Sequence, residues 1–299
     1  MDRTSRPSGP DRMSVFHEQR PRLFALAYRM LGGVSDAEDV VQDAWLRWAR
    51  AEAEVATPAA YLRSVVTRLC IDRMRALRSR REEYVGTWLP EPVPDDLLEG
   101  TGEEAQVLAE SLRFGVLLVL ERLSPIQRAV FVLRELLDCD YEEVAAAVGR
   151  NATTCRQIFL RAKARLGEDM PEKRPRAADE EVVGAFLGAL AARDLPRITA
   201  LLTEDAVSRS DHGGKAKAAY NPVHGADRVA RLILGLAVKG GRGPYPLQFE
   251  VVRLSGGPGL IARHEGVVVT AMLFDVTDGR VSALHVVRNP DKLQRLQGV

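Results

Sequence analysis

The segment from Asp140 to Leu166, DYEEVAAAVGRNATTCRQIFLRAKARL, constrains the fold more than any other part of the chain. Apolar residues recur at helical spacing up to Val148, Gly149 follows where a glycine ends a helix, and Asn151 stands where an N-cap begins the next. The pattern predicts a helix-turn-helix whose second helix enters the major groove of DNA. An ordinary helical hairpin with a solvated basic face is the alternative. The expected DNA-contacting residues of the second helix are Thr153, Thr154, Arg156, Gln157, Arg161, Lys163 and Arg165.

Charge is segregated along the chain, although the formal net charge of its 299 residues is only +1. Residues 63–81 hold seven arginines and one acid, and residues 82–104 hold eight acids with no Lys or Arg. This pattern predicts two nucleic-acid modules joined by an acidic, proline-containing linker over residues 85–104. Tyr61 and Tyr84 can stack on bases, while a solvated basic helix is the competing interpretation. The arginines expected to contact DNA are Arg68, Arg73, Arg75, Arg78, Arg80 and Arg81.

The composition argues against membrane insertion, disulfides and metal chemistry. No apolar run approaches membrane-span length, and residues 1–13 are polar with no hydrophobic segment behind them, which predicts a disordered leader. The three cysteines are far apart, and the five histidines lack metal-ligand spacing. We therefore expect a cytoplasmic protein with no metal site and no cofactor.

Residues 14–84 predict a first helical module. Gly32 and Gly33 end one helix, and Ser35 with Glu38 three positions later forms a capping box for the next. Thr57-Pro58 then starts a helix that extends to about Arg81. Taken by itself, the exposed side of the middle helix is a solvated polar face. Its members are Glu38, Asp39, Gln42, Asp43 and Arg47.

The rest of the chain predicts a second helical module, a short linker and an α+β tail. The module covers residues 105–170, with a helix from Leu112 to Leu123 and a helix start at Ser124-Pro125, and the linker covers residues 171–178. In the tail, residues 179–299, one helix at 179–192 precedes strands, and Asp278-Gly279 signals a hairpin. The expected strands are 206–210, 247–254, 260–269, 270–276 and 281–288.

Three segments together resemble a sigma factor of the extracytoplasmic-function type: SDAEDVVQDAWLRWAR, TPAAYLRSVVTRLCIDRMRALRSRR and LSPIQRAVFVLRELLDCDYEEVAAAVGRNATTCRQIFLRAKARL. The resemblance implies that the first segment binds core RNA polymerase through Glu38, Asp39, Gln42, Asp43 and Arg47. It also implies that the second segment recognises the −10 promoter element and the third the −35 element. The implied fold is therefore multidomain, with two all-α sigma modules, region 2 and region 4, ahead of the α+β tail.

The tail resembles a SnoaL-like cone domain, and three short motifs resemble those of the SigJ-like subgroup of sigma factors. WLPEP and NPDKL are intact, whereas DHGGK carries His212 where the subgroup has glycine. The resemblance implies a transcription initiation factor that is not an enzyme and that is regulated in cis by its tail. The implied regulatory residues are Trp88, Leu89, Pro90, Glu91, Pro92, Asp211, Gly213, Gly214, Lys215, Asn289, Pro290, Asp291, Lys292 and Leu293.

Two other functions stay open at the level of sequence. The tail can be an isomerase or cyclase fused to a DNA-binding module, or a sensor with a small ligand in its cavity. The chain can also be a helix-turn-helix repressor with a ligand-binding tail, but that scheme gives the arginine-rich and acidic helices no role. Candidate proton-transfer residues of an enzymatic tail are Asp211, His212, His224, His264 and His285.

Overall fold

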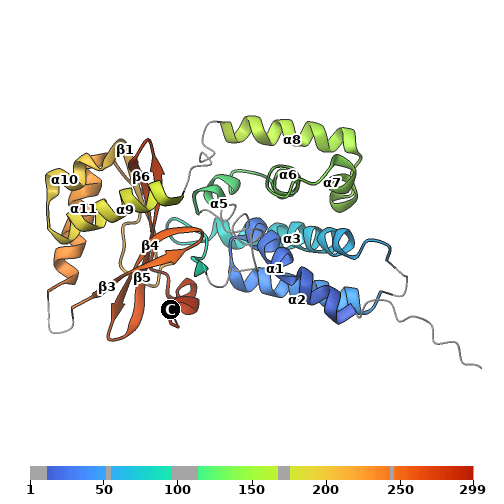
Figure 1. Ribbon diagram of the computed structural model, residues 1–299, viewed down its shortest axis with the longest axis horizontal. Coiled ribbons are helices and arrows are strands. Elements are labelled where there is room, and N and C mark those ends of the chain that lie inside the picture. Colours follow the sequence, from blue (N-terminus) through green and yellow to red (C-terminus); the bar gives the residue numbers. More distant parts are fainter. Residues whose placement is uncertain (1–11, 52–54, 96–113, 168–175, 243–245, 299) are drawn as a thin grey trace, which may run out of the picture. The chain divides into compact units, whose positions relative to one another are not determined.

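The computed structural model describes residues 12–51, 55–95, 114–167, 176–242 and 246–298, without the side chains of 78–82 and 176–178 (Figure 1). The chain divides into two compact units. Unit 1 contains residues 1–76 and 123–165, and unit 2 contains residues 77–122 and 166–299. None of the described helices is both long and apolar enough to cross a membrane.

The first module of unit 1 consists of three helices, α1 (Arg12–Leu31), α2 (Val34–Ala49) and α3 (Pro58–Glu82). Helix α1 begins at Arg12, so Arg12 and Met13 of the expected leader are helical, and residues 1–11 lie outside the described residues. The capping box at Ser35 is wrong: Gly33 is the N-cap and makes no side-chain cap bond. Gly32, with φ of +72°, turns the chain so sharply that α2 starts at Val34, whose side chain enters the core.

The second module carries the expected helix-turn-helix. Ser124 and Gln127 form a capping box, Gly149 ends its helix with φ of +67°, and the Asn151 side chain accepts a hydrogen bond from the Thr154 amide at 2.7 Å. These predicted caps are confirmed. The helix expected at 112–123 is observed from Phe114 and ends at Leu120, and Leu112 lies outside the described residues. The elements are α5 (Phe114–Leu120), α6 (Pro125–Phe131), the π-helix η2 (Val132–Leu136), α7 (Tyr141–Val148) and α8 (Ala152–Leu166).

The tail is a six-stranded sheet in the order β2-β1-β6-β5-β4-β3, with three helices. Neighbouring strands are antiparallel except β1 and β6, which run parallel. The predicted fold class, two helical modules followed by an α+β domain, is confirmed. The helices are α9 (Arg176–Ala191), α10 (Leu195–Ala200) and α11 (Ala226–Gly240). The strands are β1 (Leu202–Asp211), β2 (Val223–His224), β3 (Gln248–Leu254), β4 (Gly257–His264), β5 (Val267–Thr277) and β6 (Arg280–Val287).

Two details of the tail differ from the sequence prediction. Helices α10 and α11 were not predicted, although α11 has an apolar face that contributes Val229, Ala230 and Ile233 to the core. The turn between β4 and β5 lies at Glu265-Gly266, both with positive φ, and not between residues 269 and 270. Residues 267–269, which were expected in the preceding strand, belong to β5, because that strand begins at Val267. The predicted hairpin at Asp278-Gly279 is confirmed.

The two faces of the sheet pack against different parts of the chain. One face forms a core with the three tail helices, including Phe186, Ile198 and Ile233. The opposite face packs against Leu89, Phe114 and the C-terminal residues Leu293 and Leu296. Segments on both sides of the helix-turn-helix therefore complete the tail's second core.

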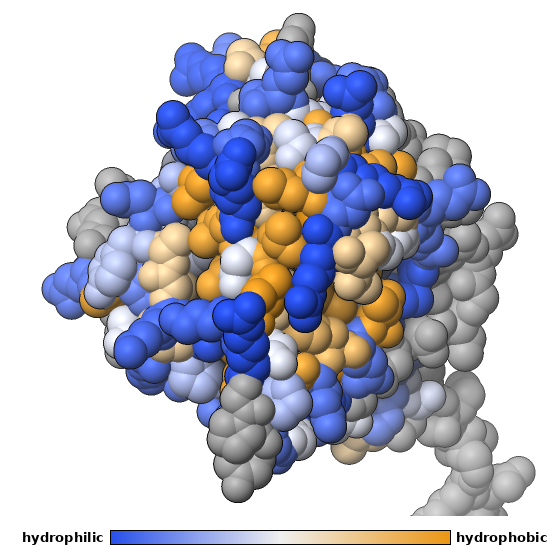
Figure 2. Space-filling model, turned by 90° about the vertical axis from the view of Figure 1, so that its left-hand side faces the viewer, coloured by the Kyte–Doolittle hydropathy of each residue, from blue (hydrophilic) through white to orange (hydrophobic). Residues whose placement is uncertain are grey.

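Figure 2, which faces the side of the tail with α10 and α11, shows apolar residues gathered among hydrophilic ones. Exposed apolar residues of the tail include Leu236, Phe249 and Val251, exposed by 50%, 47% and 65%.

Candidate functional site

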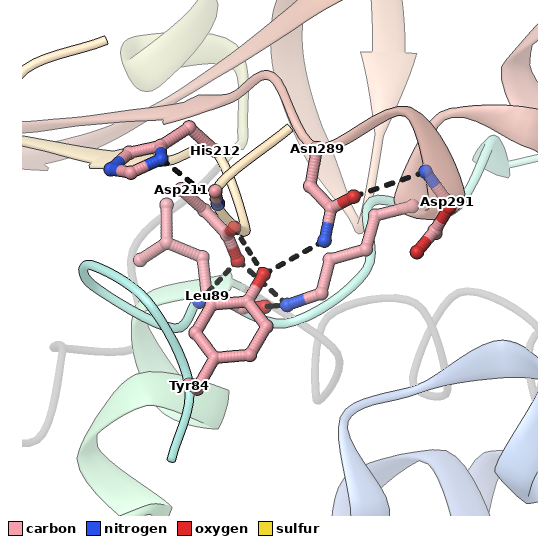
Figure 3. Close-up of polar contacts among 8 residues, drawn as sticks. Tyr84, Leu89, Asp211, His212, Asn289 and Asp291 are labelled. Atoms are coloured by element: carbon pink, nitrogen blue, oxygen red, sulfur yellow. Dashed lines mark hydrogen bonds and ion pairs between the residues drawn. The ribbon is translucent and has the colours of Figure 1, made fainter. Parts of the chain in front are cut away.

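Asp211 is the centre of the site that joins the linker to the tail (Figure 3). It ends β1 beside the parallel strand β6, and its backbone oxygen accepts hydrogen bonds from the amides of Arg288 (2.7 Å) and Asn289 (3.1 Å). The Asp211 side chain is fully buried. A buried carboxylate is costly unless it is paired and hydrogen-bonded.

Both carboxylate oxygens of Asp211 have partners from distant segments. Oδ1 accepts a hydrogen bond from the Tyr84 hydroxyl at 2.5 Å. Oδ2 accepts one from the Leu89 amide at 2.9 Å and an ion-paired one from Lys292 Nζ at 2.7 Å. Lys292 Nζ also donates to the Leu89 carbonyl at 2.5 Å. One carboxylate thus binds the WLPEP linker and the NPDKL segment at the same time.

Asn289 extends this network around Tyr84. Its Nδ2 donates to the Tyr84 hydroxyl at 2.8 Å, and its Oδ1 accepts from the Asp291 amide at 3.1 Å. Burial raises the pKa of Tyr84, and the hydrogen bond to the Asp211 carboxylate raises it further. We call Tyr84, Leu89, Asp211, Asn289 and Lys292 the linker–tail junction.

The loop after Asp211 needs glycine where it approaches Asn289. Gly213 has φ of +54°, and a Cβ there would lie 2.5 Å from Asn289 Nδ2. Positive φ falls on Gly213 and Gly214, so His212 does not need the conformation that the replaced glycine would have allowed. His212 Nδ1 accepts a hydrogen bond from the Gly214 amide at 3.1 Å. The loop also holds Asp291 through an ion pair with Lys215.

The remainder of the linker is also anchored to the tail. Val93 exchanges two hydrogen bonds with Ser255, at 2.7 and 3.1 Å, and Asp95 accepts one from the Gly256 amide at 2.7 Å. Lys292 Nζ lies 4.3 Å from the centre of the Trp88 ring. Residues Leu89, Pro90, Glu91 and Pro92 are buried. Tyr84 is held in the junction through its hydroxyl group, and its base stacking stays a prediction.

The predicted polymerase-binding residues lie on one face of α2. Asp39, Gln42, Asp43 and Arg47 are exposed, and Glu38 is half-buried. Arg73 of α3, an expected DNA contact, instead pairs with Asp36 at 2.6 Å and with Asp39 at 3.4 Å. The hydrogen bond to Asp36 raises the pKa of Arg73.

Arg68 of α3, another expected DNA contact, binds the end of α7. It donates to the Ala146 carbonyl at 2.6 Å and to the Ala147 carbonyl at 3.1 Å, two acceptors in the last turn of that helix. Arg63 lies 2.7 Å from Cys139 Sγ and 3.5 Å from Glu143. We call this set the α3–α7 contact.

The remaining residues expected to contact DNA lie on α3 and α8. Arg75 is exposed and pairs with Asp72, whereas the side chains of Arg78, Arg80 and Arg81 lie outside the described part of the structure. Thr154 of α8 is half-buried. The other expected residues of α8 are exposed, namely Thr153, Arg156, Gln157, Arg161, Lys163 and Arg165.

The structure does not gather the proposed catalytic residues of the tail into one site. His285 is fully buried, its Nε2 lies 2.8 Å from Asp275 Oδ2, and the Phe114 ring packs on it at 5.2 Å. His224 and His264 are exposed. Asp211 is occupied by the junction. Within the described residues, no group of three or more metal-ligating side chains is gathered.

Comparison with known proteins decides the family. Residues 15–81 match the family model Sigma-70 region 2, and residues 113–166 match Sigma-70, region 4. The chain is 39% identical over 289 residues to the ECF RNA polymerase sigma factor SigJ of Mycobacterium tuberculosis, which covers 94% of this chain and 92% of that protein. This chain belongs to the ECF RNA polymerase sigma factors.

The similarity of this sigma factor to its relatives includes the tail. The probable ECF RNA polymerase sigma factor SigI of Mycobacterium tuberculosis is 28% identical, with 95% of each chain covered. The crystal structure of the Mycobacterium tuberculosis extracytoplasmic function sigma factor SigJ superposes with a TM-score of 0.76 and 36% identity, over 95% of this chain and 98% of that one.

Sequence reasoning missed two features of this sigma factor's site. Tyr84 lies just beyond an arginine-rich helix, and that position favoured a nucleic-acid role. Its contact with Asp211 could not be predicted because the two residues are 127 positions apart in the sequence. Phe114 and His285 meet through the register of β6, and no local pattern signals that register. The available signal was a histidine within an apolar, strand-like run, His285, four residues before Asn289.

Proposed function

We propose that this sigma factor binds core RNA polymerase through the exposed face of α2 and contacts promoter DNA through α3 and α8. Its tail regulates initiation in cis and is not an enzyme. Family membership supports the first part. The observation that carries the regulatory part is the buried Asp211 carboxylate, which binds the linker and the NPDKL segment together. Such a protein works in the cytoplasm, with core polymerase and promoter DNA as partners.

The linker supplies the physical route from the tail to the sigma modules. Tyr84 follows the end of α3 by two residues, and Phe114 begins α5, which ends shortly before Ser124 caps α6. Both positions pack on the tail, so the chain between the two modules is held near each end. A connection held in this way restricts the separations that the modules adopt. The tail shifts their equilibrium to the extent that the junction differs in free energy between those arrangements.

The α3–α7 contact is the part of unit 1 that we expect DNA to replace. Arg68 binds neutral carbonyl oxygens there, and a phosphate oxygen is a stronger, charge-assisted acceptor for a guanidinium group. Promoter DNA therefore competes with α7 for Arg68. We infer that promoter binding exchanges one set of partners for the other.

Run-off transcription with core polymerase tests the regulatory role. The double variant Asp211→Asn, Lys292→Met removes both charges of the junction with little change in volume. The control, Asp227→Asn with Arg231→Met, removes an exposed ion pair of α11. We expect a severalfold change in transcript yield for the first variant and none for the control. Equal yields from both would contradict regulation through the junction.

Polymerase binding is tested separately. Asp39→Lys with Asp43→Lys reverses two exposed charges of α2, and like charges across an interface cost several kcal/mol. Core binding should weaken strongly while the far-ultraviolet circular dichroism spectrum stays unchanged. Core binding at the parent's affinity would refute the assignment of this face.

A sensor role for the tail is the second candidate. The observation that favours it is the exposure of three large apolar residues of the tail, Leu236, Phe249 and Val251. An apolar fluorescent probe such as anilinonaphthalene sulfonate should then bind the native protein and be released by Phe249→Ser. Equal probe binding by the parent and the variant would remove support for a ligand at this surface.

A further inference from the structure

Helix α8 presents a second stripe of residues directly opposite its buried one. Cys155, Phe159, Ala162 and Leu166 face the core at spacings of four, three and four residues. A stripe with the same spacings, shifted by two residues and so turned to the far side of the helix, is exposed to solvent. Its members are Thr153, Gln157, Leu160 and Ala164.

Leu160 is the unexpected member of this outward stripe. Its side chain is 61% exposed, more than that of any other exposed leucine of the described chain. A single exposed leucine is common on protein surfaces. This one lies one turn from Gln157, in the middle of the face that a helix-turn-helix inserts into the major groove.

The basic residues of α8 lie beside the stripe. The Arg156 guanidinium lies 4.6 Å from the centre of the Tyr141 ring, and Lys163 Nζ lies 5.9 Å from that of Phe159. Both side chains therefore turn toward the body of the module. Arg161 and Arg165 follow on the other flank. Positive charge on both sides of a mixed polar and apolar ridge matches a DNA groove, whose floor is bordered by phosphates on both sides.

We propose that Leu160 contacts the methyl group of a thymine in the −35 element, with Gln157 bound to an adenine of a neighbouring base pair. The thymine methyl is the apolar group on the major-groove floor, and adenine presents the donor and acceptor that a glutamine amide matches. The two residues are three positions apart, about 4.5 Å along the helix, and neighbouring base pairs are about 3.4 Å apart, so the two side chains can meet adjacent pairs. This inference rests on the proposed promoter binding, and it assigns sequence readout to the stripe and phosphate contact to its basic flanks.

Replacing thymine by uracil tests the contact because it removes only the methyl group. The full-length protein with core polymerase first selects its −35 sequence from randomised promoter duplexes. Each selected thymine is then replaced in turn by uracil. We expect one position at which uracil weakens binding about fourfold, the factor for one buried methyl group. The variant Leu160→Ala should bind the thymine and uracil duplexes equally at that position.

The control variant Leu236→Ala shortens an exposed leucine of the tail and should keep the parent's preference for thymine. Parent binding that is indifferent to uracil at every position overturns the inference, even if Leu160→Ala fails to fold. So does a selected element without thymine, or a Leu160→Ala variant that still distinguishes the two bases. A holoenzyme that selects no −35 sequence overturns the proposed promoter binding as well.

Discussion

The linker–tail junction and the α3–α7 contact both join distant segments, but with different partners. In the junction, a fully buried carboxylate meets a lysine, a tyrosine hydroxyl and a backbone amide. In the α3–α7 contact, the Arg68 guanidinium meets two neutral carbonyls and its side chain stays exposed. The ion pair of that contact, between Arg63 and Glu143, spans 3.5 Å and is partly exposed. In the junction, the positive charge of Lys292 is paired with the negative charge of Asp211. The two hydrogen-bond acceptors of Arg68 at the end of α7 are uncharged.

This difference indicates which contact is permanent. Removing one member of a buried ion pair leaves the other charge in a place where water cannot replace it. An exposed arginine that binds neutral carbonyls loses little when it exchanges them for water or phosphate. The junction is therefore suited to hold the linker on the tail, and the α3–α7 contact is suited to open when DNA arrives.

Loss of the Asp211 carboxylate should have the largest effect. Asp211→Ala removes the carboxylate that binds Lys292, the Leu89 amide and the Tyr84 hydroxyl, and breaking a buried pair costs about 3–5 kcal/mol of unfolding free energy. Urea unfolding measures the loss. Asp227→Ala, which removes an exposed carboxylate of α11, is the control and should change stability little. A small effect at Asp211 would show that the junction is not closed in solution.

Gly213→Ala should have the next largest effect, about 2–3 kcal/mol. The substitution strains a positive φ and also places a Cβ 2.5 Å from Asn289 Nδ2. Gly266→Ala strains a positive φ of +81° where a Cβ meets nothing within 4 Å, so it should lose only about 1–2 kcal/mol. Thermal unfolding of the two variants isolates the contribution of Asn289. Equal losses would mean that the loop moves away at no cost.

Arg68→Ala tests the other side of the comparison. Removing two charge-assisted hydrogen bonds, one exposed and one partly buried, should lower the unfolding free energy by about 1 kcal/mol. The same variant should reduce the slope of duplex affinity against salt concentration by about one if Arg68 moves to a phosphate. Arg228→Ala on α11 controls for the loss of one positive charge. An unchanged salt slope would leave Arg68 with α7 in the promoter complex.

The pH dependence of Tyr84 should be the smallest effect. Its folded pKa is raised above the usual value of about 10, so the unfolded chain releases this proton first as pH rises. The contribution of Tyr84 to the unfolding free energy is fully present below about pH 10. It is lost as the pH rises above that value, because the unfolded state then binds fewer protons than the folded state. Urea unfolding from neutral to alkaline pH should show a flatter decline for Tyr84→Phe than for the parent. Parallel declines would contradict a buried, hydrogen-bonded hydroxyl.

The sequence by itself determined the local structure of the sigma modules. The capping box at Ser124, the glycine at 149 and the N-cap at Asn151 each act within one helical turn, so residues a few positions apart specify them. The capping box predicted at Ser35 was wrong because the two preceding glycines placed the turn earlier, and the start of β5 shifted with its neighbouring turn. The residue at which a helix or strand begins depends on which side chain is buried in the core, as Val34 is at the start of α2.

Only the tertiary structure decided which partners the charged residues have. Tyr84 and Asp211 are 127 residues apart, and they meet because β1 ends beside β6, where the chain turns into the NPDKL segment. Arg68 and Arg156 belong to similar basic helices, yet one binds the end of α7 and the other lies over a tyrosine ring. Helical periodicity specifies which face of a helix is polar. The partner of each polar group depends on sheet register and helix packing, which connect segments that no local pattern relates.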